Sequence, residues 1–211
     1  TIEDTIEFTN KSYNCIVNHR EVGRDTQGFA AALRGALRED PNIIMVGELR
    51  DFETISLAVE ASSTGHLVFG TLHTQDASKT VDRVIEVFPT AMQEQIRSTL
   101  SDSLKGVIAQ TLIKRKDKKG RVAALEILVH TPAVGSLIRE GKTHQLINVI
   151  QTGKRLGMRL MDDSIEELLN QGMISPEDAF EKAIDKMRFI KQLKEVPEEY
   201  KELYDKAIAS S

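Results

Sequence analysis

The sequence predicts an α/β protein in two parts, a parallel sheet with crossover helices followed by a helical part. Strand-like apolar runs alternate with segments of helical spacing from Thr1 to about Leu104, and this order is typical of parallel strands joined by helices. Beyond Pro132 the apolar residues recur only at helical spacing. We therefore expect a first domain at residues 1–130 and a helical subdomain at residues 131–211.

The first elements follow from short stretches of sequence. The opening TIEDTIEF is expected to be a strand that runs into a polar turn. Residues 29–40 carry apolar side chains one helical turn apart, so they are expected to form a helix. The four apolar residues Ile43–Val46 predict a strand buried on both faces, which ends at Gly47 and presents the carboxylate of Glu48.

The next elements continue this alternation. DFETISLAVEASS predicts a helix that stops at Thr64 and Gly65, and HLVFGTLHT predicts a second buried strand. Asp76 is expected to cap the following helix, which Pro89 ends. A further helix carries its apolar stripe at Met92, Ile96, Leu100 and Leu104.

The pattern changes after residue 105. VIAQTLIKR and RVAALEILV flank the turn KDKKG and predict an antiparallel hairpin. The basic run Lys114–Arg121 favours a solvated hairpin tip over a contact with a membrane or an acidic partner. Ser175 is expected to cap a helix with Pro176 in its first turn. An apolar stripe in the tail is expected to serve packing and comprises Tyr200, Leu203, Tyr204 and Ala207.

Composition excludes several classes of protein. The net charge of -4, the 5% of aromatic residues and the lack of Trp argue against a nucleic-acid motor, which needs basic stripes and stacking aromatics. No apolar run approaches the roughly 20 residues that span a bilayer. The single Cys15 excludes an internal disulfide framework and a four-cysteine zinc site. We expect a cytosolic protein without a structural metal. Because the sequence begins at Thr1 without Met or a signal-peptide pattern, we also expect an internal fragment.

Polar side chains gather at the ends of the predicted strands. Glu48 follows one strand, and an acid in this place suits a nucleotide site, where it can activate a water or hold Mg²⁺ through one. An equally weighted alternative is that Glu48 pairs with Arg50 or caps the helix near Asp51. The other strand-end residues are Glu3, Asp4, Glu7, His66, His73 and Thr74.

Two features limit what the strand-end residues can do. His66 and His73 are seven residues apart, so a regular strand would place them on opposite faces and they are not expected to share a metal. Each could hydrogen-bond a phosphate or a neighbouring subunit, although a lone histidine at a strand end is more often structural. The sequence also lacks the phosphate loop GxxxxGK[ST]. GSLIREGKT has five residues between its glycines, and TGKR is preceded by Asn148 where the first glycine belongs.

Four motifs in order resemble those of the type IV pilus retraction ATPases, members of the secretion ATPase superfamily. TIEDTIEF resembles the Asp box, with Thr5 where Pro is usual, and REDPNIIMVGELRD resembles the atypical Walker B motif. STGHLVFGTLHTQDA resembles the His box. AVGSLIRE is similar to the AIRNLIRE motif of retraction motors, with changes at Val134, Gly135 and Ser136.

The resemblance implies a RecA-like P-loop NTPase core, N-terminally truncated and followed by an α-helical subdomain. It implies ATP and Mg²⁺ as ligands, Glu48 as the glutamate that prepares the attacking water, and Glu7 as its supporting acid. His66 and His73 would link the site to the ring, and Arg83 would serve a subunit interface. The resemblance also implies that the nucleotide and Mg²⁺ site is supported by Glu3, Asp4, His66, His73 and Thr74.

The resemblance also implies a homohexameric motor for pilus retraction and twitching motility. Such a motor works at the cytoplasmic face of the bacterial inner membrane, is only peripherally associated with it, and acts on the inner-membrane platform protein of the pilus. No role in nucleic-acid binding is implied.

Two departures from the family pattern bear on activity. The family's Walker A loop and PAS-like domain are expected before Thr1, so the chain is expected to hold half a nucleotide site, to bind ATP poorly and to be inactive alone. Pilus-assembly and type II secretion ATPases usually carry a tetracysteine insertion, whereas LIKRKDKKGRVAA has no cysteine, which favours retraction. The alternatives are an assembly or type II/IV secretion ATPase, or a non-catalytic ring or docking module.

Overall fold

The computed structural model describes residues 1–193, 195–202 and 204, and the chain divides into two compact units. We call the first the sheet unit; it comprises Thr1–Thr74, Lys79–Lys105 and Thr131–Thr143. The second, the hairpin unit, comprises Gln75–Ser78, Gly106–His130 and the described residues from His144 onward. The two units therefore alternate along the chain. The predicted division into an ATPase core at 1–130 and a helical subdomain at 131–211 stays a prediction.

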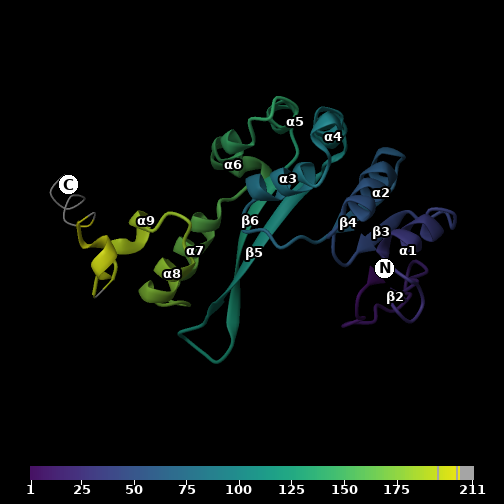
Figure 1. Cartoon of the computed structure of the whole chain (residues 1–211). Helices are drawn as coiled ribbons and strands as arrows, with labels where there is room; N and C mark the ends of the chain where they lie inside the picture. Colours follow the sequence, from purple (N-terminus) through teal and green to yellow (C-terminus); the bar gives the residue numbers. More distant parts are fainter. Residues whose placement is uncertain (194, 203, 205–211) are drawn as a thin grey trace. The chain divides into compact units, whose positions relative to one another are not determined.

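The sheet unit contains a four-stranded parallel sheet (Figure 1). Its strands lie in the order β2-β1-β3-β4, and every neighbouring pair is parallel. This confirms the α/β class and the parallel sheet. The strand bounds are Ile2–Glu3 for β1, Arg20–Glu21 for β2, Ile43–Val46 for β3 and Leu67–Gly70 for β4.

One face of this sheet is covered by helices α1 (Phe29–Ala36) and α2 (Phe52–Ser63). Their apolar side chains form one core with alternate residues of the strands, because side chains of a strand point to opposite faces in turn. The most deeply buried members of this core are Leu33, Val46, Ala61, Ile2 and Ile44.

The prediction that the apolar strands are buried on both faces is wrong. Ile43 is 61% exposed, and in β4 Leu67 and Phe69 are 40% and 55% exposed. The register pairs Ile43 with Leu67 and Met45 with Phe69, so these side chains lie on the face away from α1 and α2. A run of apolar residues identifies a strand but does not say whether the same chain covers its second face.

Helix ends in the sheet unit follow capping chemistry. The Asp51 side chain accepts the Thr54 backbone N–H at 2.9 Å at the start of α2, and Gly65 takes a left-handed φ of 107° just beyond its end. The remaining helices of this unit are α4 (Thr90–Ser103), α5 (Pro132–Arg139) and most of α3 (Ala77–Glu86).

Helix α5 contains the AVGSLIRE motif and docks on α4. Val134 and Ile138 are fully buried, and Arg139 Nη2 donates to Ser101 Oγ and Asp102 Oδ1, both at 2.8 Å. The motif thus has a local structural role that joins two helices of the sheet unit.

The hairpin unit is built on a long antiparallel ribbon. Strands β5 (Gly106–Lys114) and β6 (Arg121–Val129) pair along their whole length, which confirms the predicted hairpin. Helices α6 (Leu146–Thr152), α7 (Met161–Asn170), α8 (Pro176–Lys182) and α9 (Met187–Ile190) follow, with short 3₁₀ turns at Thr143–Gln145, Lys154–Leu156 and Glu198–Tyr200.

Residues from the ribbon and from α7 to α9 share one apolar core. The Ser175 side chain accepts the Asp178 N–H at 3.0 Å and starts α8, as predicted. Tyr200 packs edge-on against Phe180 with ring centroids 5.2 Å apart, so this part of the tail does serve packing. Leu203 and Ala207 of the predicted stripe lie outside the described residues. Across the described residues, no helix combines the length and the apolarity that crossing a bilayer requires.

Candidate functional site

The site forms at the edge where β1 and β3 end. Gly47 N–H donates to Ile2 O at 2.7 Å, and a Cβ added to Gly47 would lie 3.1 Å from that oxygen and 3.2 Å from Glu3 Cα. A Cβ at this position would push β1 and β3 apart by a few tenths of an ångström, so a glycine suits the place where β3 passes β1 at close range. This close approach brings the residue after Gly47, which is Glu48, beside the residue after β1, which is Asp4.

Four charged or polar side chains join at this edge. Arg50 Nη2 lies 2.5 Å from Glu48 Oε2 and 2.8 Å from Asp4 Oδ2, so one cation bridges two acids. His73 Nε2 lies 3.2 Å from Glu48 Oε1. The Glu48 side chain is 18% exposed, whereas that of His73 is 87% exposed. We call Asp4, Glu48, Arg50 and His73 the edge cluster.

The edge cluster stabilises the ionised form of Glu48. The hydrogen bond from Arg50 is the largest cause that lowers the pKa of Glu48, with smaller contributions from the charges of Arg50 and His73. The pKa of Arg50 is raised by the same bond and by Asp4. Glu48 is therefore a carboxylate at neutral pH, able to accept a proton or a hydrogen bond.

The residues that follow β4 are hydrogen-bonded to the residues that follow β3. Thr71 Oγ1 donates to Gly47 O, and the Leu49 N–H donates to Thr71 O at 2.9 Å. These bonds hold the residues on either side of Glu48 against the segment that carries His73. Further along, Thr74 Oγ1 shares a hydrogen bond of 2.7 Å with Thr80 Oγ1.

The structure brings some of the predicted site residues together and keeps others apart. Glu3 Oε1 accepts a hydrogen bond from Thr1 Oγ1 at 2.6 Å and lies 3.7 Å from His19 Nδ1. Glu7 is exposed and has no polar partner within the described part of the chain. His66 lies at the opposite end of β4 from His73, with Nδ1 3.1 Å from Ala61 O. The roles assigned to these residues stay predictions.

Two arginines differ in how the structure bears on their predicted roles. Arg83 is exposed on α3, and its interface role stays a prediction. The sequence suggests Arg50 only as a partner of Glu48, whereas in the structure Arg50 also pairs with Asp4. The contact with Asp4 could not be found from sequence, because it depends on β1 and β3 being neighbours in the sheet.

The chemistry of the edge cluster suits a hydrated magnesium ion beside a phosphate. Carboxylate oxygens from Asp4 and Glu48 are the ligand type that Mg²⁺ takes, usually through its bound waters. Within the described residues no group of three or more His, Cys, Asp or Glu side chains could enclose a metal ion by itself.

Parallel sheets of this kind bind their ligands beyond the carboxyl ends of the strands, where the edge cluster lies, so the fold and site are typical of a nucleotide-binding α/β protein. The chain belongs to the type II/IV secretion system protein family, whose model matches residues 1–181. This family consists of secretion ATPases, and the resemblance seen in the motifs is thereby confirmed.

Two curated relatives match most of this chain. The chain is 59% identical over 183 residues to the type IV pilus retractation ATPase PilT of Pseudomonas aeruginosa, covering 87% of this chain and 53% of the relative. It is 55% identical to the twitching motility protein of Neisseria gonorrhoeae, covering 87% and 49%. The chain thus spans about half the length of the curated relatives it matches.

Solved structures show the same fold. The crystal structure of the pilus retraction motor PilT with bound ADP matches at a TM-score of 0.81 and 46% identity, over 89% of this chain and 52% of that one. The ATPase DotB of Legionella pneumophila matches at a TM-score of 0.74 and 32% identity, over 84% of this chain and 49% of that one.

Proposed function

We propose that this chain is the catalytic-glutamate part of an ATP-hydrolysing motor that drives type IV pilus retraction. The observation that carries the proposal is Glu48, which stands at the carboxyl end of β3 as an ionised acid held by Arg50 and His73. High identity to a pilus retractation ATPase and to a twitching motility protein supports the choice of process. The core would be RecA-like, as in P-loop NTPases.

In this proposal the side chains of the edge cluster prepare water for attack on the terminal phosphate of ATP. Glu48 accepts a hydrogen bond or proton from the water, Arg50 holds the Glu48 carboxylate in place, and His73 contacts its other oxygen. Asp4 and Glu48 would hold a hydrated Mg²⁺, which when bound neutralises charge on the phosphates. Because the sequence has no GxxxxGK[ST], the phosphates would be cradled by residues outside this sequence.

The remaining assignments extend the same proposal. Glu7 would support Glu48, Glu3 and Thr74 would line the nucleotide site, and His66 would link it to the ring. Arg83, exposed on α3, would face a neighbouring subunit of a homohexamer. The ring would work at the cytoplasmic face of the inner membrane on the platform protein of the pilus.

Retraction is preferred to assembly or secretion on two observations. The hairpin tip between β5 and β6 is short and lacks cysteine. The assembly ATPase PilB of Myxococcus xanthus is 44% identical over only 54% of this chain, whereas the relatives named for retraction or twitching match over 87%.

The first test is Glu48→Gln in the full-length ATPase. Because Gln accepts no proton at this position, we expect kcat to fall by about a hundredfold or more while ATP still binds. Steady-state phosphate release measures hydrolysis, and equilibrium titration with a fluorescent ATP analogue measures binding. Glu60→Gln is the matched control, since Glu60 is an exposed glutamate on α2, away from the edge cluster, and its kcat should match the wild type.

The two readouts separate the alternatives. Loss of hydrolysis with retained binding supports catalysis by Glu48. Equal hydrolysis by wild type and variant would show that Glu48 is not the catalytic glutamate, and no hydrolysis by either would instead favour a non-catalytic ring or docking module.

A further inference from the structure

The hairpin tip, residues Lys114–Arg121, joins β5 to β6 (Figure 1). Its six cationic side chains and one acidic side chain give it a net charge of +5, whereas the whole chain carries -4. The acid, Asp117, accepts two hydrogen bonds from Arg115, so this arginine already has a partner. The remaining cations are exposed, and none makes a side-chain hydrogen bond or ion pair with the described residues; they are Lys114, Lys116, Lys118, Lys119 and Arg121.

Two of these cations lie directly opposite each other. The register of the ribbon pairs Lys114 of β5 with Arg121 of β6. Like charges opposite one another in an antiparallel ladder repel and destabilise it. Within the described part of the chain no acid forms an ion pair with either side chain. The ribbon therefore carries a repulsion that an anion from outside the chain would relieve.

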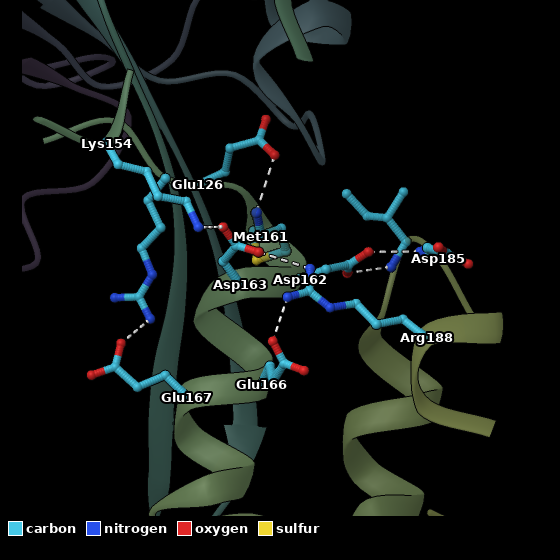
Figure 2. Close-up of polar contacts among 11 residues, drawn as sticks. Glu126, Lys154, Met161, Asp162, Asp163, Glu166, Glu167, Asp185 and Arg188 are labelled. Carbon is cyan, nitrogen blue, oxygen red and sulfur yellow. Dashed lines mark hydrogen bonds and ion pairs between the residues drawn. The ribbon is translucent and has the colours of Figure 1, made fainter. Parts of the chain in front are cut away.

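Cations around α7 are, in contrast, matched by acids of the same unit. Lys154 Nζ lies 3.0 Å from Asp163 Oδ2, and Arg188 Nη1 lies 2.8 Å from Asp163 Oδ1 (Figure 2). Arg159 Nη2 lies 2.5 Å from Glu167 Oε2. Here cations hold neighbouring elements together, and each has an acidic partner. The unpaired cations of the hairpin tip do not take part in such packing, which leaves them available to a ligand.

The backbone of the hairpin tip is held in place. The Arg115 N–H donates to Gly120 O at 3.0 Å and closes the turn, and the Lys116 N–H donates to Met173 O at 2.7 Å. The bonds from Arg115 Nε and Nη2 to Asp117, at 2.8 and 2.5 Å, brace the same turn. A ligand would therefore not have to order the turn, and only the long lysine side chains would lose freedom on binding.

An exposed apolar side chain lies next to the cations on one face of the ribbon. Leu112 is 48% exposed and lies two residues before Lys114, so both point to the same face. Ile108 is 70% exposed further along that face, whereas Ile113, on the other face, is buried. A bilayer interface takes such a combination, because apolar atoms enter the headgroup boundary while ammonium groups meet the lipid phosphates.

The kind of cation favours a lipid surface over an acidic protein. Four of the five unpaired cations are lysines, each a point charge on a flexible stem. Arginine, whose planar fork matches a carboxylate, contributes only Arg121 to this set. A lipid surface presents many phosphates without fixed positions, so it suits mobile point charges.

We propose that the hairpin tip binds anionic phospholipid headgroups at a bilayer surface, with Leu112 at the edge of the contact. A basic run by itself is typical of a solvated tip. The like-charge pair of Lys114 and Arg121 and the exposed Leu112 are the observations that point to a ligand. The hairpin tip shares no residue with the edge cluster, and the proposal does not depend on ATP hydrolysis.

The experiment measures co-sedimentation of the full-length ATPase with vesicles. One set of vesicles contains equal parts of phosphatidylglycerol and phosphatidylethanolamine, and the other contains only zwitterionic phosphatidylcholine. We expect binding to the anionic vesicles alone, and weaker binding as salt screens the charges. The test variant combines Lys116→Gln, Lys118→Gln and Lys119→Gln. Because each basic residue near an anionic surface contributes about fivefold in affinity, this variant should bind about a hundredfold more weakly.

Two further variants sharpen the result. The control variant changes to Gln three exposed lysines that are ion-paired with glutamates, namely Lys142, Lys182 and Lys201. It alters the net charge as much as the test variant does, and it should bind within about twofold of wild type, because charges away from the contact are screened. Leu112→Ser should weaken binding by about fivefold through lost apolar burial. Circular dichroism melts of the test and control variants should match the wild type, since all the changed lysines are exposed.

Several results would overturn the proposal. It fails if the wild type does not prefer the anionic vesicles, or if the test variant binds them as the wild type does. It also fails if the test and control variants are weakened alike, because binding would then follow net charge and not the hairpin tip. If the wild type binds no vesicles but shows salt-sensitive binding to polyglutamate or single-stranded DNA that the test variant loses, the hairpin tip serves an acidic protein or a nucleic acid instead.

Discussion

Arg50 determines how the acids at the edge of the sheet are held. Two carboxylates this close would repel each other, and the guanidinium between Asp4 and Glu48 removes that repulsion while leaving Glu48 ionised. Glu48 itself could be predicted, because an acid directly after a buried strand is a signal within one stretch of sequence. Its link to Asp4 could not, because the two residues are far apart in the chain and meet only through strand order.

Asp117 at the hairpin tip gives a prediction about pH. Arg115 Nε and Nη2 donate to its two oxygens at 2.8 and 2.5 Å, and this pairing lowers the pKa of Asp117 from 3.8 to about 2. Since the folded-state pKa lies below the unfolded one, the stabilisation is present above pH 4 and is lost as the pH falls towards 2.

Carboxyl-detected NMR titration checks this value. The Asp117 carbon should titrate with a midpoint of about 2 in the wild type and nearer 3.8 in Arg115→Gln. A wild-type midpoint near 3.8 would show that the bidentate pair does not persist in solution.

Among helices and strands, the features that the sequence predicts best are those whose residues lie close together in the chain. The cap at Ser175 could be predicted because it consists of a side chain and a backbone N–H only three residues further on. The hairpin was found because its turn and its two β-rich runs are contiguous. The burial of β3 on both faces was predicted wrongly, because the second face depends on what lies over it and not on the strand.

Helix α5 offers a prediction about stability. Ile138 is fully buried where α5 packs on α4, so Ile138→Ala should lower the free energy of unfolding by about 2–5 kcal/mol through lost burial and the remaining cavity. Urea unfolding followed by circular dichroism measures the change. Ser136→Ala, at an exposed position of the same helix, should stay within about 0.5 kcal/mol of wild type. A loss below about 1 kcal/mol for Ile138→Ala would mean that α5 is only loosely docked.

For the molecule as a whole, the sequence predicts the order of strands and helices except for the short strand β2, and it does not predict the two alternating units. Nothing in residues 75–78 themselves marks them as part of the hairpin unit. Within this segment the Ala77 N–H donates to Glu126 Oε1 at 2.8 Å, and Glu126 lies 49 residues further along the chain. Contacts over such separations are set by the fold and leave no local periodicity to detect.

The isolated chain of residues 1–211 should bind ATP poorly. The sequence contains no GxxxxGK[ST], so the backbone amides that cradle phosphates in this class of protein are missing from it. Isothermal titration should detect no micromolar binding to this chain, and should detect binding to the full-length ATPase. Micromolar binding by the isolated chain would mean that the edge cluster and its surroundings suffice to hold the nucleotide.

The bond between Ala77 and Glu126 also has a consequence for how the protein is made. Its two partners are 49 residues apart, and at a synthesis rate of roughly 5–20 residues per second Glu126 is made about 2–10 s after Ala77. All four strands of the parallel sheet precede Ala77 in the chain, so they leave the ribosome before the acceptor exists. We expect the parallel sheet to gain order first, and the first turn of α3 to be captured by β6 later, as the ribbon emerges.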